Sequence, residues 1–149
     1  MRYRALLAYL AMVLLVSFPL HLAWEWFQCQ PFFVHRATPP TAAAMLAATL
    51  GDLALTLMAF AAVSAVHGLR WPLERWRWLH LVTLEAVALM LAVAVELHAL
   101  AAGRWSYTDA APRLPFTGVS ALPVMQLMLL LPVSFRLPRS LALRRLGRR

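Results

Sequence analysis

The sequence predicts an all-α fold, a bundle of four transmembrane helices in one membrane domain with both termini in the cytoplasm. Hydrophobic residues make up 62% of the 149 residues and charged residues 13%, against about 45–50% and about 25% in soluble domains. A soluble domain of this length could not bury that excess. Two further observations predict the fold: four apolar runs of spanning length, and arginines that are unevenly shared between the loops.

The four expected helices follow each other with turn-forming residues between them. They cover residues 5–27, 42–66, 78–101 and, in a shorter run, 118–135. About 20 residues are enough to cross the hydrocarbon layer at the helical rise of about 1.5 Å per residue. Prolines and glycines mark the connections, at Pro31, Gly68, Pro72, Gly103 and Pro112. No repeat or linker divides residues 1–149, and residues 136–149 are expected to form a basic cytoplasmic tail.

The first apolar run could be mistaken for a secretory signal, because Arg2 and Arg4 precede it. Its apolar stretch is long, however, and no small-x-small cleavage site precedes the segment Trp24-Glu25-Trp26. We therefore expect a retained first helix.

The orientation follows from the basic residues, all fourteen of which are arginine. Eleven lie at the N-terminus, in the second loop and in the tail: Arg2, Arg4, Arg70, Arg75, Arg77, Arg136, Arg139, Arg144, Arg145, Arg148 and Arg149. The first and third loops hold only Arg36, Arg104 and Arg113. Because cytoplasmic loops carry the excess of basic residues, both ends are expected inside. Tryptophans are expected as interfacial anchors, with Trp71, Trp76 and Trp78 inside and Trp24, Trp26 and Trp105 outside.

The net charge of +8 does not indicate nucleic-acid binding, because the arginines form no basic helical face and no aromatic–basic motif. The basic tail is better explained by contact with anionic lipid headgroups. The expected partners are therefore the lipid bilayer and, as further candidates, other membrane proteins.

Four of the six acidic residues lie within the apolar runs, namely Glu25, Asp52, Glu85 and Glu96. Acids at membrane depth are costly, normally face the bundle interior and often mark a functional site. The competing interpretation is that they are neutral hydrogen-bonding groups that join helices. Four such residues in so short a chain favour a site.

Helical phase predicts which polar side chains meet. His21 and Glu25 are four residues apart and share a face. Glu85 and Glu96 are eleven residues, about three turns, apart, so both are expected to face the same interior as Asp52. His98 points elsewhere, and most of the polar set is expected between the midplane and the outer surface, with Gln126 near the midplane.

Prolines and the third loop add two weaker signals. Pro19 and Pro123 each precede a polar residue within a predicted span, where a kinked helix can line a cavity, although membrane helices are rich in proline in any case. The loop of residues 103–117 carries Trp105 and Tyr107 and could cap the pocket, or it could be an ordinary interfacial loop.

A metal site is conceivable from His21, Glu25, Asp52 and Glu96, since oxygen-rich sets suit hard cations. The sequence has no HExxH motif, no CxxC motif and no paired Glu-x-x-His, so we expect no metal site. Two histidines near the outer surface are a still weaker indication of haem, and the cofactor stays unassigned. The single cysteine, Cys29, is expected to be a small semi-buried thiol.

Four short motifs carry a resemblance: His21-Leu-Ala-Trp-Glu25, the pair Gly51-Asp52, Trp105-Ser-Tyr107 and Pro123-x-x-Gln126. Together they resemble a group of small bacterial four-helix integral membrane proteins that has no assigned activity. The resemblance covers most of the chain and implies a multi-pass protein of the bacterial inner membrane, but no reaction. Sterol-isomerase-type bundles share only the His-x-x-x-Glu step.

Three functions are compatible with these residues. The first is an outward-facing pocket that binds, or acts by acid–base chemistry on, a lipid-like or small apolar molecule, with Glu25, Glu96 and His21 as catalytic residues. Asp52, Gln126, Trp105 and Tyr107 would then bind the ligand. The second is a non-catalytic accessory or assembly subunit of a larger membrane complex. The third is a proton or cation path. Whether the protein is an enzyme stays open at this point.

Overall fold

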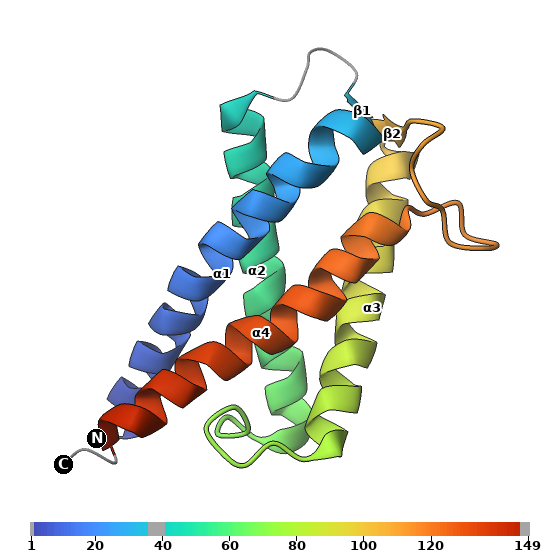
Figure 1. Cartoon of the computed structure of the whole chain (residues 1–149). Helices are drawn as coiled ribbons and strands as arrows, with labels where there is room; N and C mark the ends of the chain where they lie inside the picture. The colour runs from blue at the N-terminus through green and yellow to red at the C-terminus, as the bar shows by residue number, and fades with distance from the viewer. Residues whose placement is uncertain (1, 36–40, 147–149) are drawn as a thin grey trace.

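The computed structural model describes residues 2–35 and 41–146 and has four long helices (Figure 1). These are α1 (Arg2–Phe32), α2 (Ala42–His67), α3 (Trp78–Ala101) and α4 (Ala121–Leu146). Two three-residue strands, β1 (Phe33–His35) and β2 (Trp105–Tyr107), complete the fold. All four helices are long and apolar enough to cross a membrane, which confirms the all-α fold with four candidate spans.

The helices form a closed ring in which α1 packs on α2 and α4, and α3 packs on the same two helices. The start of α1, the end of α4 and the α2–α3 connection lie at one end of the bundle, and β1 and β2 lie at the other (Figure 1). Residues from all four helices can therefore meet at the bundle axis.

The bounds of α2 and α3 agree with the sequence prediction to within one residue, whereas α1 and α4 differ from it. Gly118 has a φ of 70°, a left-handed conformation that no helix accepts, and Ser120 Oγ accepts a bond of 3.2 Å from the Leu122 amide. The fourth helix therefore starts after residue 118. It continues through Pro132 and Pro138, so residues 136–146 of the predicted tail are helical. Arg36, Arg148 and Arg149 lie outside the described residues.

The prolines affect two helices differently. Pro19 lies inside α1, so the Leu15 carbonyl one turn earlier lacks its helical amide partner. Pro123 lies in the first turn of α4, where amides have no partner within the helix, so it breaks no helical hydrogen bond.

One end of the bundle, which we call the aromatic end, is filled by Tyr9, Phe60, Trp71 and Phe135. The Trp71 and Phe135 ring centroids are 5.3 Å apart, and the Tyr9 hydroxyl donates a bond of 2.7 Å to the Phe135 carbonyl. The Trp71 indole donates a bond of 3.1 Å to the Ser64 hydroxyl. Trp71 is 0% exposed, so its predicted place as an interfacial anchor is wrong. Its ring closes the core at this end.

At the opposite end, β1 and β2 form a short antiparallel ribbon in which Phe33 pairs with Tyr107. Phe33, Tyr107 and Ala111 form a separate small core there. The ribbon ties the end of α1 to the segment that follows α3, and it fixes Trp105 and Tyr107 over the upper part of the bundle. We call this the pocket end.

Candidate functional site

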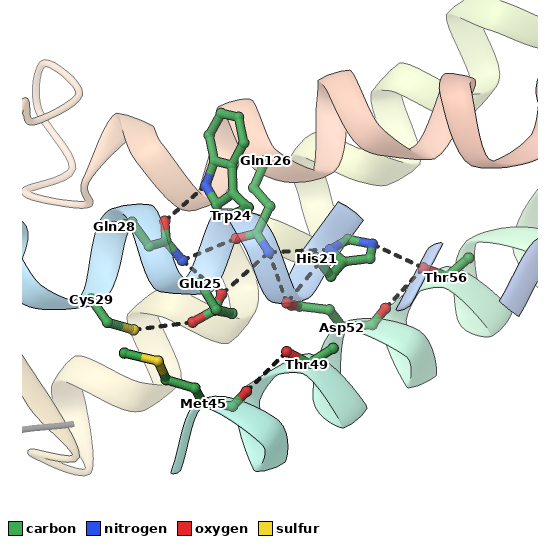
Figure 2. Close-up of polar contacts among 10 residues, drawn as sticks. All are labelled: His21, Trp24, Glu25, Gln28, Cys29, Met45, Thr49, Asp52, Thr56 and Gln126. Atoms are coloured by element: carbon green, nitrogen blue, oxygen red, sulfur yellow. Dashed lines mark hydrogen bonds and ion pairs between the residues drawn. The ribbon is translucent and has the colours of Figure 1, made fainter. Parts of the chain in front are cut away.

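The polar side chains of three helices meet around Gln126 of α4 (Figure 2). Its amide nitrogen lies 2.7 Å from Asp52 Oδ2, 3.1 Å from His21 Nδ1 and 3.2 Å from Glu25 Oε1. The nitrogen has only two hydrogens for these three neighbours. Gln126 is 2% exposed, so water cannot easily replace any of the contacts. The Gln126 amide therefore links α1 and α2 through the polar side chains that it contacts.

His21 is fully buried, and the hydrogen count of its neighbours indicates its tautomer. The Thr56 hydroxyl donates its hydrogen to the Asp52 carbonyl at 2.9 Å, so it can only accept from His21 Nε2 at 3.4 Å. With its hydrogen on Nε2, the ring presents a lone pair at Nδ1. Nδ1 lies 3.5 Å from Asp52 Oδ2. Asp52, rather than Glu25, is thus the carboxyl that His21 contacts.

Glu25 is surrounded by hydrogen-bond donors. Its Oε1 accepts from the Gln28 amide at 2.7 Å, and its Oε2 accepts from the Cys29 thiol at 3.2 Å. Gln28 also donates to Gln126 at 3.0 Å and accepts from the Trp24 indole at 3.0 Å. Asp52 Oδ2 lies 2.7 Å from the same Gln126 amide nitrogen that contacts Glu25 Oε1, so the two carboxyls converge on one donor.

Glu96 enters the site from α3 and is held by the ribbon. Its Oε2 accepts hydrogen bonds from the Trp105 indole, at 3.3 Å, and from the Tyr107 hydroxyl. Burial raises the pKa of the Tyr107 phenol above its ordinary value, and the bond to Glu96 acts in the same direction. Tyr107 therefore remains a donor, while Oε1 of Glu96 accepts no bond from the described part of the chain.

A single cavity of about 500 Å³ connects these groups. Its polar wall contains Glu25, Asp52, Glu96 and Gln126, and its apolar wall contains small and aliphatic side chains of α2 and α3. Trp105 and Arg104 line it as well, and the Arg104 guanidinium lies 5.2 Å from the centre of the Trp105 ring. Neither His21 nor Tyr107 lines the cavity; each lies behind one of its carboxyls.

The helical-phase prediction is confirmed for Glu25, Asp52 and Glu96, which line one cavity, and His98 is exposed as expected. It is wrong for Glu85, which is half-buried and lies outside the cavity lining. The α3 residues of the lining begin at Ala92, and Glu85 lies seven residues, about 10 Å along the helix, before it. Glu85 therefore shares the phase of Glu96 but not its level in the bundle.

Several site residues escaped sequence reasoning. Gln28 follows His21 by seven residues and Glu25 by three, so the same face of α1 could have indicated it. Cys29 is 6% exposed and bonds to Glu25, which its lone position in the sequence does not suggest. Arg104 reaches the cavity only because the ribbon positions it, and no local pattern encodes that pairing.

Within residues 2–35 and 41–146, no group of three or more His, Cys, Asp or Glu side chains is arranged to hold a metal ion. No known protein family, curated protein or solved structure matches this chain. The resemblance to small bacterial membrane proteins is therefore supported by the four apolar helices alone.

Proposed function

We propose that this protein binds a lipid-like or small apolar molecule in the cavity and acts on it by acid–base chemistry. We further propose that it is a multi-pass protein of the bacterial inner membrane, related to the small four-helix group. The arginine distribution favours cytoplasmic termini, which would turn the pocket end outward.

The observation that carries this proposal is the cavity itself. Acids that only join helices would be sealed against each other, whereas Glu25, Asp52 and Glu96 all reach one space of about 500 Å³. Cavities of about 300–1,000 Å³ with mainly apolar walls and a few polar groups are typical of small-molecule sites. This combination supports a ligand rather than adhesion between helices.

The hydrogen-bond pattern supports assigned roles for the side chains. Glu96 and the Glu25–Asp52 pair would exchange protons with the ligand, and Gln126 would orient the pair. The Nδ1 lone pair of His21, which the Gln126 amide contacts at 3.1 Å, would accept a proton that moves from Asp52, at 3.5 Å. Tyr107 would stabilise charge on Glu96 without touching the ligand.

The test compares two intramembrane glutamates of the same helix. Glu96→Gln keeps the size and hydrogen bonding of the side chain but cannot exchange a proton, so we expect it to lower function about 10²–10⁴-fold. Glu85→Gln is the matched control, since Glu85 lies outside the cavity lining. The measurements are complementation of a deletion strain and thermal unfolding in detergent. Full function of Glu96→Gln in a normally folded protein would contradict the proposal.

Glu85 itself supports a second candidate, an accessory subunit of a larger membrane complex. It is half-buried at membrane depth, and no residue in the described ranges pairs with its carboxyl. A partner helix that donates a hydrogen bond would satisfy it. Loss of function in Glu85→Gln together with full function in Glu96→Gln would favour this candidate.

A further inference from the structure

Part of the cavity wall is exposed at the side of the bundle, along α2. Four residues of α2 line the cavity and are exposed at the same time: Ala44, Ala47, Ala48 and Gly51. Ala92 and Val95 of α3 line the same cavity. All six positions lie within the two candidate membrane spans. A molecule in the bilayer could therefore reach the cavity without passing through water.

The exposed part of this wall carries small side chains. A Cβ atom added at Gly51 would meet nothing within 4 Å, so the backbone does not need glycine for packing here. The other three exposed lining positions of α2 are alanines, whereas the larger Met45 and Leu55 line the cavity from less exposed positions. Small side chains at these four positions leave room for an apolar chain beside α2.

Apart from Arg104, whose guanidinium lies over the Trp105 ring, the polar groups that line the cavity offer acceptors and hardly any free donors. The amide hydrogens of Gln28 and Gln126 and the Cys29 thiol already point at Glu25, Asp52, His21 and each other. The Trp105 indole and the Tyr107 hydroxyl both donate their hydrogen bonds to Glu96. Oε1 of Glu96, a residue that is 5% exposed, receives no donor from the described residues. A ligand head that binds there must supply hydrogens.

The charges of the groups that line the cavity also favour a hydrogen-donating ligand head. Three carboxyls line the cavity, and the cation at its rim, Arg104, stacks on Trp105 instead of pairing with them. In the described residues, the single ion-pair contact is that of His21 with Asp52. Burial in apolar surroundings disfavours an ionised carboxyl, and in the described residues no arginine lies within ion-pair distance of these three to offset that cost. A cation is the complement that such a wall requires.

We propose that the ligand is a cationic amphiphile, a protonated amine on an apolar chain, which enters from the bilayer between α2 and α3. Its ammonium group would donate hydrogen bonds to Asp52 and Glu96, and its chain would lie along Ala48 and Gly51. This inference rests on the proposed function and specifies the head group and the route.

The experiment uses the full-length protein in lipid nanodiscs and three chain-brominated probes: tetradecylamine, tetradecanol and tetradecanoate. Bromine near the cavity quenches tryptophan fluorescence, and Trp105→Phe removes the signal that comes from the cavity wall. We expect the amine to bind at least tenfold more tightly than the alcohol and the fatty acid. Asp52→Asn and Glu96→Gln should each weaken amine binding about tenfold.

The route is tested with a matched pair on α2. Gly51→Phe should fold, because its Cβ has free space, and should weaken or slow amine binding by filling the opening. Ala61→Phe is the control, since Ala61 is exposed on the same helix but does not line the cavity. Equal amine binding by both variants would overturn the lateral route.

The other outcomes separate this inference from the proposed function. Tighter binding of the alcohol or the fatty acid would overturn the amine and leave the pocket standing. Absence of binding by all three probes, with loss of complementation in Glu96→Gln, would also overturn the amine alone. Absence of binding with full complementation by Glu96→Gln would overturn both.

Discussion

The two ends of this bundle differ in the side chains that lie at the bundle axis. The aromatic end is closed by the rings of Trp71, Phe135 and Tyr9, which fill the bundle axis. The Tyr9 hydroxyl and the Trp71 indole each donate a hydrogen bond within the bundle. The pocket end leaves a cavity of about 500 Å³ at the same axis and surrounds it with carboxyls. The same four helices are thus tightly packed at one end and spread around a polar site at the other.

The difference predicts that the two ends contribute unequally to stability. In a bilayer, helices gain little from the hydrophobic effect between them, so close packing and hydrogen bonds hold the bundle together. The aromatic end supplies the packing, which allows the pocket end to keep buried carboxyls and free space. Substitutions at the two ends should therefore separate folding from ligand binding.

The largest expected effect on stability comes from Trp71→Ala at the aromatic end. A buried tryptophan replaced by alanine costs about 3–5 kcal/mol in soluble cores, and we expect about 3 kcal/mol, since lipid rather than water is the reference. Reversible unfolding in mixed micelles measures it. Trp78→Ala is the control, because Trp78 is 70% exposed. Similar losses of stability in the two variants would contradict the claim that packing at the aromatic end stabilises the bundle.

Gln126→Leu should cost less but affect both properties. The substitution leaves Asp52, Glu25 and His21 without their shared amide, and an unsatisfied buried polar group costs about 1–3 kcal/mol. We expect a moderate loss of stability in micelles and complete loss of complementation. Leu131→Ala, a packing change further along α4 and outside the cavity lining, should lower stability with less effect on function. A silent Gln126→Leu would show that the polar network is dispensable.

Tyr107→Phe should change the response of stability to alkali. Because the pKa of Tyr107 is raised in the folded protein, the unfolded chain loses this proton first as the pH rises past about 10. Folding stability then falls with pH, by at most about 1.4 kcal/mol per pH unit for one group. The phenylalanine variant should lack that part of the slope. Unfolding in micelles between neutral and alkaline pH measures it, and an unchanged slope would contradict the raised pKa.

The smallest effect is expected from His98→Ala. His98 is exposed and lies outside the cavity lining, although it is only two residues from Glu96. Substitutions at such positions usually change stability by less than about 0.5 kcal/mol. Thermal unfolding and complementation should both match the unchanged protein. A loss of function here would extend the site beyond the cavity.

More of the fold than of the candidate site could be predicted from the sequence. Apolar length alone predicts four spans, and local breakers place α2 and α3 within a residue. The bounds of α1 and α4 could not be read in this way, because prolines at 31, 132 and 138 do not end these helices. Whether these helices continue past their prolines depends on packing against neighbouring helices, and a local sequence pattern contains no information about that packing.

For the site, periodicity within one helix brings together His21 and Glu25, but not partners from different helices. The contact of His21 with Asp52 and the central place of Gln126 depend on how α1, α2 and α4 pack. Glu85 shows the converse limit, since a similar phase to Glu96 did not bring it into the cavity. Helical phase predicts a face, whereas packing decides what that face meets.

The position of Cys29 gives the molecule a built-in chemical reporter. The sequence has one cysteine, and its buried thiol lines the cavity and bonds to Glu25. Thiol-directed reagents therefore have a single target, without any need to remove other cysteines. The rate at which membrane-soluble and water-soluble maleimides label it would tell from which phase the cavity is reached, and protection from labelling would measure occupancy in intact cells.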